Sequence, residues 1–99
     1  DPERDAALLG EVSAPRVVFG HYHLQFRRRH SDAIELVGPG SVGLPLDGDR
    51  RAAYATIAPD GTLELHRVMY DHRVTLAALA KLDTEWSHGV AGWVQDARM

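Results

Sequence analysis

The chain has 99 residues and no cysteine, so disulfides and thiolate metal sites are excluded. Its net charge of −3 lacks the basic excess typical of nucleic-acid-binding proteins, and no apolar run approaches the ~18 residues needed to span a bilayer. Hydrophobic residues make up 44% and charged residues 25% of the chain, ordinary values for a globular domain. We therefore expect one soluble, mixed α/β domain over residues 1–99, in a reducing, cytoplasmic location.

The first predicted element is a short helix over residues 2–11. Asp1 suits the N-cap and Pro2 the first helical position. The apolar side of this helix is formed by Ala6, Ala7, Leu8 and Leu9. A chain that starts within a helix and lacks an initiator methionine is expected to be the C-terminal portion of a larger domain, with its partner half upstream.

A predicted strand over residues 16–19 leads into two histidines. The strand is apolar at consecutive positions, as in a strand covered on both faces, and Gly20-His21-Tyr22-His23 follows it. In an extended backbone, residues two apart point to the same side, so the side chains of His21 and His23 could reach one site. Neutral imidazole binds Mn, Fe, Ni or Zn. Taken alone, the pair fits either metal ligands or loop histidines without a ligand.

Two further strands are predicted at residues 24–30 and 33–37, joined at Ser31-Asp32. The run Arg27-Arg28-Arg29 could form an anion-binding patch, but alternation along a strand points adjacent side chains to opposite faces and favours a solvated stretch. Residues 38–45 contain three glycines and two prolines, which predicts an irregular loop.

The C-terminal part is predicted to contain a hairpin and two helices. Strands at 52–58 and 62–70 flank a tight turn at Pro59-Asp60-Gly61. The apolar positions change face near His66, which predicts a bulge or burial on both faces. Helices are predicted at 72–82, capped by Asp71, and at 85–97. The second helix carries an apolar stripe formed by Trp86, Val90, Trp93 and Val94.

The remaining acidic and histidine residues with possible metal-binding patterns are not predicted to bind a metal. Asp47-Gly48-Asp49 lacks the further spaced ligands of a calcium loop. The remaining histidines have no partner at a ligand-like spacing, so structural roles are expected for His30, His66, His72 and His88.

Gly20-His21-Tyr22-His23, followed by Gly38-Pro39-Gly40-Ser41-Val42-Gly43, resembles the C-terminal half of calcineurin-like metallophosphoesterases, in particular the small bacterial and archaeal phosphodiesterases. The similarity covers most of residues 5–71. It implies an α/β fold, part of a two-sheet sandwich flanked by helices. It also implies hydrolysis of a phosphoester small molecule or nucleotide with two divalent metal ions, manganese first and iron, nickel or zinc as alternatives.

By this resemblance, His21 would bind the second metal and His23 the first. The residues expected to support them are Gly20, Tyr22, Gly40 and Ser41. Gly38 stands where the family usually has Asn, and Tyr22 stands where it has Thr or His. The family's D-x-H, G-D and G-N-H segments are absent, so this chain is expected to supply only part of a site.

Two other functions stay open at this stage. The chain could be a non-catalytic protein-interaction scaffold on the metallophosphoesterase fold, or an unrelated α/β domain with a chance pair of histidines. The edges of a truncated sheet favour pairing with another chain, so a homo-oligomer is also considered. Neither a membrane nor a nucleic acid is expected as a partner.

Overall fold

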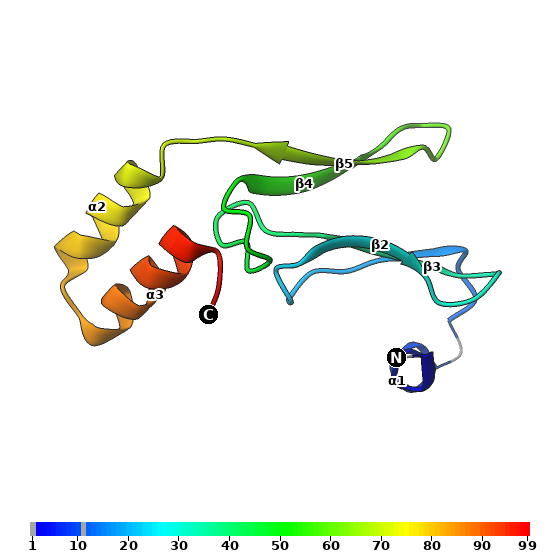
Figure 1. The fold of residues 1–99 in the computed structure, drawn as a ribbon. Helices are drawn as coiled ribbons and strands as arrows, with labels where there is room; N and C mark the ends of the chain where they lie inside the picture. Colours follow the sequence, from blue (N-terminus) through cyan, green and yellow to red (C-terminus); the bar gives the residue numbers. More distant parts are fainter. Residues whose placement is uncertain (1, 11) are drawn as a thin grey trace.

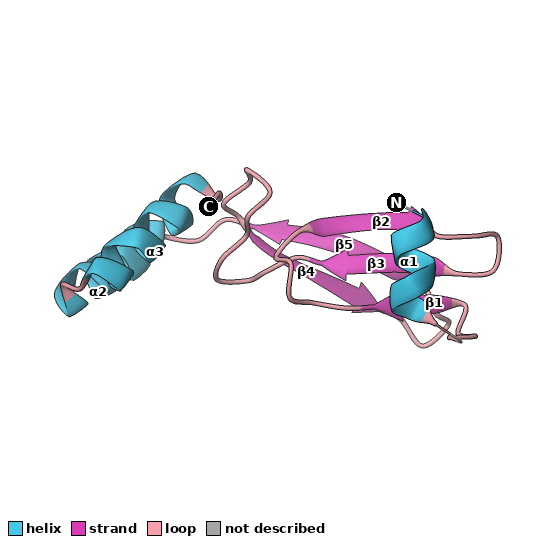
Figure 2. Cartoon of the chain, turned by 90° about the horizontal axis from the view of Figure 1, so that it is seen from below, coloured by secondary structure: helices cyan, strands magenta, loops and turns pink. Residues whose placement is uncertain are grey.

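The computed structural model of the chain describes residues 2–10 and 12–99, and it places two small sheets face to face (Figure 1). Helix α1 (Pro2–Leu9) lies against the outer face of one sheet, and helices α2 and α3 lie beyond one end of both (Figures 1 and 2). The predicted cap at Asp1 and the predicted helix end at residue 11 lie outside the described residues. The expected two-sheet sandwich with flanking helices is confirmed.

The larger sheet is built around one buried strand. In spatial order its strands are β1 (Arg16–Val18), β3 (Glu35–Pro39) and β2 (Gln25–Arg29). β1 runs parallel to β3 and β2 runs antiparallel to it. Leu36 and Val37 point to opposite faces of β3 and both are buried, so both faces of this central strand are covered. The prediction that both faces of the first strand are covered is wrong, since Val18 is exposed at the edge of the sheet.

Strand β3 extends further than its sequence suggests. Gly38 and Pro39 continue the ladder opposite Phe26 and Gln25, so the prediction of irregular structure from residue 38 is wrong. A Cβ at position 38 would lie 2.5 Å from the ring of Phe26, so glycine makes room for that ring. Pro39 is tolerated because β1 pairs only with residues 35–37 and no strand flanks β3 on that side at position 39.

The smaller sheet is the predicted hairpin of β4 (Ala52–Ile57) and β5 (Leu63–Val68). Its register is continuous from the Ala52–Val68 pair to the Ile57–Leu63 pair, so the predicted bulge near His66 is wrong. Burial on both faces is wrong as well, because Val68 is exposed. β4 contacts β3, and this is where the two sheets meet.

Helix α1 is attached to the sheet by an ion pair. Both carboxylate oxygens of Asp5 accept hydrogen bonds from Arg28, at 2.7 and 2.9 Å. The hydrogen bond from Arg28 is the largest cause that lowers the pKa of Asp5. The predicted apolar side of the helix is wrong, since Asp5 is buried while Leu8 is 77% exposed. Arg27 likewise pairs with Glu35, so the arginine run is half exposed but not a free anion-binding patch.

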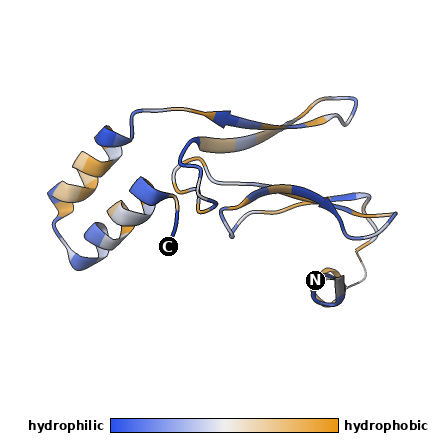
Figure 3. Cartoon of the chain, viewed as in Figure 1, coloured by the Kyte–Doolittle hydropathy of each residue, from blue (hydrophilic) through white to orange (hydrophobic). Residues whose placement is uncertain are grey.

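Helices α2 (His72–Leu82) and α3 (Glu85–Asp96) form a hairpin whose main packing is between the two helices. Asp71 caps α2 as predicted, accepting from the amide of Arg73 at 3.1 Å. The predicted stripe on α3 is wrong at Trp86, which is 68% exposed. Figure 3 shows apolar residues along both helices of this hairpin.

The base of the helical hairpin is tied to the loop that precedes β4. The amide of Gly48 donates to the carbonyl of Ala97 at 3.0 Å, and Nε2 of His72 lies 2.6 Å from the carbonyl oxygen of Arg50. The rest of the hairpin extends away from the sheets (Figures 1 and 2). Across the described residues, no helix is both long and apolar enough to cross a membrane.

Candidate metal site

The two histidines of the candidate site lie in a turn that follows β1. His21 has a φ of 85° and His23 a φ of 61°, both in the left-handed region. That region costs a non-glycine residue on the order of 1 kcal/mol, so surrounding contacts must hold it. The expectation of extended backbone here is wrong. The two side chains therefore owe their placement to the contacts of each ring and not to strand alternation.

His23 is held on two sides by the loop that follows β3. Its Nδ1 lies 2.8 Å from the carbonyl oxygen of Leu44, and its own carbonyl accepts from the amide of Leu46 at 3.1 Å. Pro45, between these two anchors, is completely buried. A carbonyl oxygen can only accept, so Nδ1 carries the proton and the lone pair is on Nε2. Histidines that bind metals are usually oriented by such a bond from the other ring nitrogen.

The loop that holds His23 is itself fixed to β4. The Oγ of Ser41 accepts from the amide of Leu44 at 2.9 Å, and the carbonyl of Ser41 accepts from the amide of Ala53 at 3.0 Å. Gly40 has a φ of 88°, and a Cβ on it would lie 2.6 Å from the Cβ of Ala53. Gly40 and Ser41, predicted as support for the site, thus shape the loop that carries Leu44.

His21 is exposed, and ring contacts link it to the sheet. Its imidazole lies edge-on to the ring of Tyr22, with centroids 5.3 Å apart. Tyr22 contacts Phe19 at 6.2 Å, and Phe19 contacts Phe26 at 5.7 Å, both edge-on. A Cβ at Gly20 would meet no atom within 4 Å, so no steric demand for glycine is visible there.

Sequence reasoning missed a cluster of polar contacts next to this loop. Arg67 pairs with Asp47 and donates to Oε1 of Gln25 at 2.8 Å, which links β5, the loop and β2. Burial raises the pKa of Asp47, but the hydrogen bond from Arg67 and the amide of Gln25 outweigh it and lower the pKa. One signal for this cluster is present in the sequence. Alternation along β5 places the charged Arg67 on the same face as the buried Leu63.

Asp49 and the four other histidines lie next to polar groups of the protein. Asp49 pairs with Arg51 at 2.7 Å. The histidines predicted to be structural lie close to polar groups: His30 to Asp5 (3.8 Å), His66 to Thr56 (2.8 Å), His72 to the carbonyl of Arg50 (2.6 Å) and His88 to Asp83 (2.9 Å). These contacts are of the kind expected for structural histidines, and the structural roles stay a prediction.

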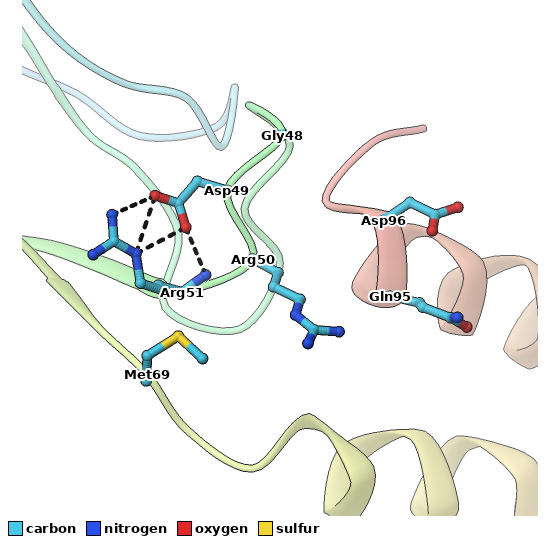
Figure 4. A pocket seen from close by; sticks show the side chains of 7 residues that line it. All are labelled: Gly48, Asp49, Arg50, Arg51, Met69, Gln95 and Asp96. Carbon is cyan, nitrogen blue, oxygen red and sulfur yellow. Dashed lines mark hydrogen bonds and ion pairs between the residues drawn. The ribbon is translucent and has the colours of Figure 1, made fainter.

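A separate hollow of about 570 Å³ lies at the base of the helical hairpin (Figure 4). The side chain of Arg50 extends from the loop toward Gln95 and Asp96 of α3, while Asp49 and Arg51 are bonded to each other. Neither His21 nor His23 lines this hollow. It is therefore no extension of the histidine turn.

The histidine pair has too few neighbouring donors for a complete metal site. In the part of the chain that the structure describes, no group of three or more His, Cys, Asp or Glu side chains could hold a metal ion. The donor set that is present, two imidazoles with one Nε2 made available by a backbone bond, fits divalent ions of the Mn to Zn series. Further metal ligands would have to come from residues other than His21 and His23.

Comparison with known proteins supports the fold. No protein-family model matches the sequence, and no curated protein matches it significantly. The structure matches that of a metallophosphoesterase from Sphaerobacter thermophilus with a TM-score of 0.78 and 22% identity, over 98% of this chain and 47% of that chain. This chain has the fold of part of a metallophosphoesterase. It spans about half the length of that protein, and the resemblance predicted from the two motifs is confirmed at the level of the fold.

Proposed function

We propose that this chain supplies two metal-ligating histidines, His21 and His23, to a metal-dependent phosphoester hydrolase. One observation carries the proposal: the imidazole of His23 is fixed through Nδ1 to a backbone carbonyl, which leaves Nε2 as a ligand atom. The likeness in fold to a metallophosphoesterase supports the choice of chemistry. We further propose that residues 1–99 are the C-terminal portion of a larger domain, whose upstream half supplies the other ligands.

The proposed cofactors are two divalent metal ions, manganese first and iron, nickel or zinc as alternatives. When bound, such ions activate water as a nucleophile and neutralise charge on the phosphoryl group. The residues of this chain hold the two imidazoles in place: the Leu44 carbonyl fixes the tautomer of His23, and Tyr22 packs on the ring of His21. The substrate class is a phosphodiester, a phosphomonoester or a nucleotide, and the cytoplasmic location stays a prediction.

Hydrolysis of bis-p-nitrophenyl phosphate with Mn²⁺, measured on the intact protein that contains this chain, tests the proposal. We expect His23→Ala to lower kcat at least ~100-fold, at the upper end of losses for perturbed metal sites. His88→Ala is the matched control, because His88 lies in α3 next to Asp83 and should leave kcat unchanged. Equal activity of the two variants would contradict the proposal.

A non-catalytic interaction scaffold on the same fold is the second candidate. It is favoured by the absence of a third ligand beside the histidines among the described residues. It predicts that the intact protein binds no stoichiometric metal and that His21→Ala and His23→Ala change neither metal content nor hydrolysis.

A further inference from the structure

The helical hairpin exposes two apolar stripes. On α2, Val74 and Leu82 are 68% and 58% exposed, and Ala78 lies between them at helical spacing. On α3, Trp86 is exposed and stands one turn before the exposed Gly89 and two turns before Trp93, which is half-buried. A run of large apolar side chains on solvent is unusual unless another surface covers it.

The two stripes lie on the same side of the hairpin. Leu76 and Leu79 mark the side of α2 that packs on α3, and Ser87 and Val94 mark the corresponding side of α3. At 100° per residue, the exposed stripe of each antiparallel helix is rotated from its packed side toward the same face. That face, formed by Val74, Ala78, Leu82, Trp86, Gly89 and Trp93, is called the hairpin face below.

The side chains of the hairpin face would fit those of the same face on a second copy in size. Val74 and Trp93 lie the same number of residues from the turn at 83–84, and so do Ala78 and Gly89. If α2 of one copy lies on α3 of a second copy, Val74 meets Trp93 and Ala78 meets Gly89. Small residues then meet at the centre, where two helices can approach closely, and large apolar side chains close the ends.

The charges fit the same arrangement. α2 contains no aspartate or glutamate, and α3 contains no lysine or arginine. Lys81 and Glu85 flank the hairpin face at nearly the same distance from the turn. No ion pair joins Lys81 to Glu85 within the described part of one copy. Stacking α2 on α3 of the other copy would place each lysine beside a glutamate, twice per dimer.

We propose that the hairpin face is a homodimer interface, in which two hairpins form an antiparallel four-helix bundle about a twofold axis. Each α2 packs on the α3 of the partner copy, and the charges set the orientation more than the affinity. Within the described residues the hairpin lies beyond both sheets (Figures 1 and 2), and coverage of the hairpin face by an upstream segment of the same chain is the alternative that a monomeric protein would indicate.

The oligomeric state of the intact protein, measured by light scattering across a dilution series, tests the interface. Gly89→Arg should shift a dimer to a monomer without harming the fold, because a Cβ there meets nothing within 4 Å and arginine favours helix over glycine. Gln95→Arg is the matched control: Gln95 is exposed on the same helix, and at 100° per residue it lies on the opposite side of α3 from Trp86 and Trp93. A protein that is monomeric at ~100 µM, or one that both substitutions affect equally, would overturn the proposal.

Charge reversal tests the pairing between copies. Lys81→Glu and Glu85→Lys should each weaken the dimer about fivefold, since like charges then meet across the interface. Mixing the two variants should restore wild-type affinity, because only the heterodimer pairs opposite charges at both positions. Failure of the mixture to recover dimer would contradict the proposed stacking.

Discussion

Nδ1 of His23 and the carbonyl oxygen of Leu44 lie 2.8 Å apart, although 21 positions separate the two residues in the chain. This bond joins the histidine turn to the glycine-rich loop, the two stretches from which the resemblance to metallophosphoesterases was predicted. The loop therefore acts directly on a candidate ligand: it fixes the tautomer and orientation of the ring.

Removing the hydroxyl of Ser41 should loosen the loop that holds His23. In Ser41→Ala the amide of Leu44 loses its acceptor, which should cost about 1 kcal/mol of stability and weaken Mn²⁺ binding about tenfold in the intact protein. Denaturant unfolding and calorimetric titration measure the two effects. Ser31→Ala is the matched control, because its Oγ accepts from Ile34 in a distant turn. Ser31→Ala should lose about as much stability as Ser41→Ala but keep the Mn²⁺ affinity of the wild type. If both variants lost the same affinity, Ser41 would have no special role in holding His23.

Gly40→Ala should destabilise the protein more than Gly61→Ala. Both glycines have a φ of 88°, so both substitutions carry the backbone cost of about 1 kcal/mol. Only at position 40 would the new Cβ clash, 2.6 Å from the Cβ of Ala53, which adds about 2 kcal/mol. Equilibrium urea unfolding gives the difference between the two variants. Indistinguishable free energies of unfolding would show that the loop is not packed on β4 as described.

Acid should weaken the link between the sheets at Asp47. Its pKa is lowered in the folded protein, so its contribution to stability is present above the unfolded value of about 4 and is lost as pH falls through the lower folded pKa. Asp47→Asn should be less stable than the wild type at pH 7 by about 2 kcal/mol and should lose less stability on acidification. Urea unfolding between pH 7 and pH 3 measures both. An unchanged acid dependence in Asp47→Asn would contradict this role.

Substitutions at Gly38 and Phe26 should have non-additive effects on the free energy of unfolding. Gly38→Ala should cost about 2 kcal/mol, because its Cβ would stand 2.5 Å from the Phe26 ring. Phe26→Leu removes the obstructing ring atoms but leaves the carbonyl oxygen of Leu24, 2.7 Å from the same Cβ, so the cost of Gly38→Ala should fall by about 1 kcal/mol in that background without vanishing. A double-mutant cycle by denaturant unfolding gives the coupling, and additive effects would contradict the close packing.

Elements with local signals could be predicted from the sequence. The hairpin around Pro59-Asp60-Gly61 and the helix capped by Asp71 depend on residues close in the chain, and both are present. The association of the histidine turn with the glycine-rich loop also followed from sequence, through the resemblance.

Features set by distant contacts could not be predicted. Gly38 and Pro39 belong to a strand because Phe26 and Gln25 pair with them, and Asp5 is buried because Arg28 reaches it from β2. The left-handed backbone of the histidine turn likewise depends on its anchors at Leu44 and Leu46. None of these causes lies in the neighbouring sequence, where local propensity acts.

The metal content of the intact protein, measured by elemental analysis after saturation with Mn²⁺ and removal of excess, tests the central claim most directly. We expect about two equivalents in the wild type and in His88→Ala, and about one equivalent fewer in His23→Ala, because that ring supplies a ligand to one ion. Unchanged metal content in His23→Ala would contradict the assignment of His23 as a metal ligand.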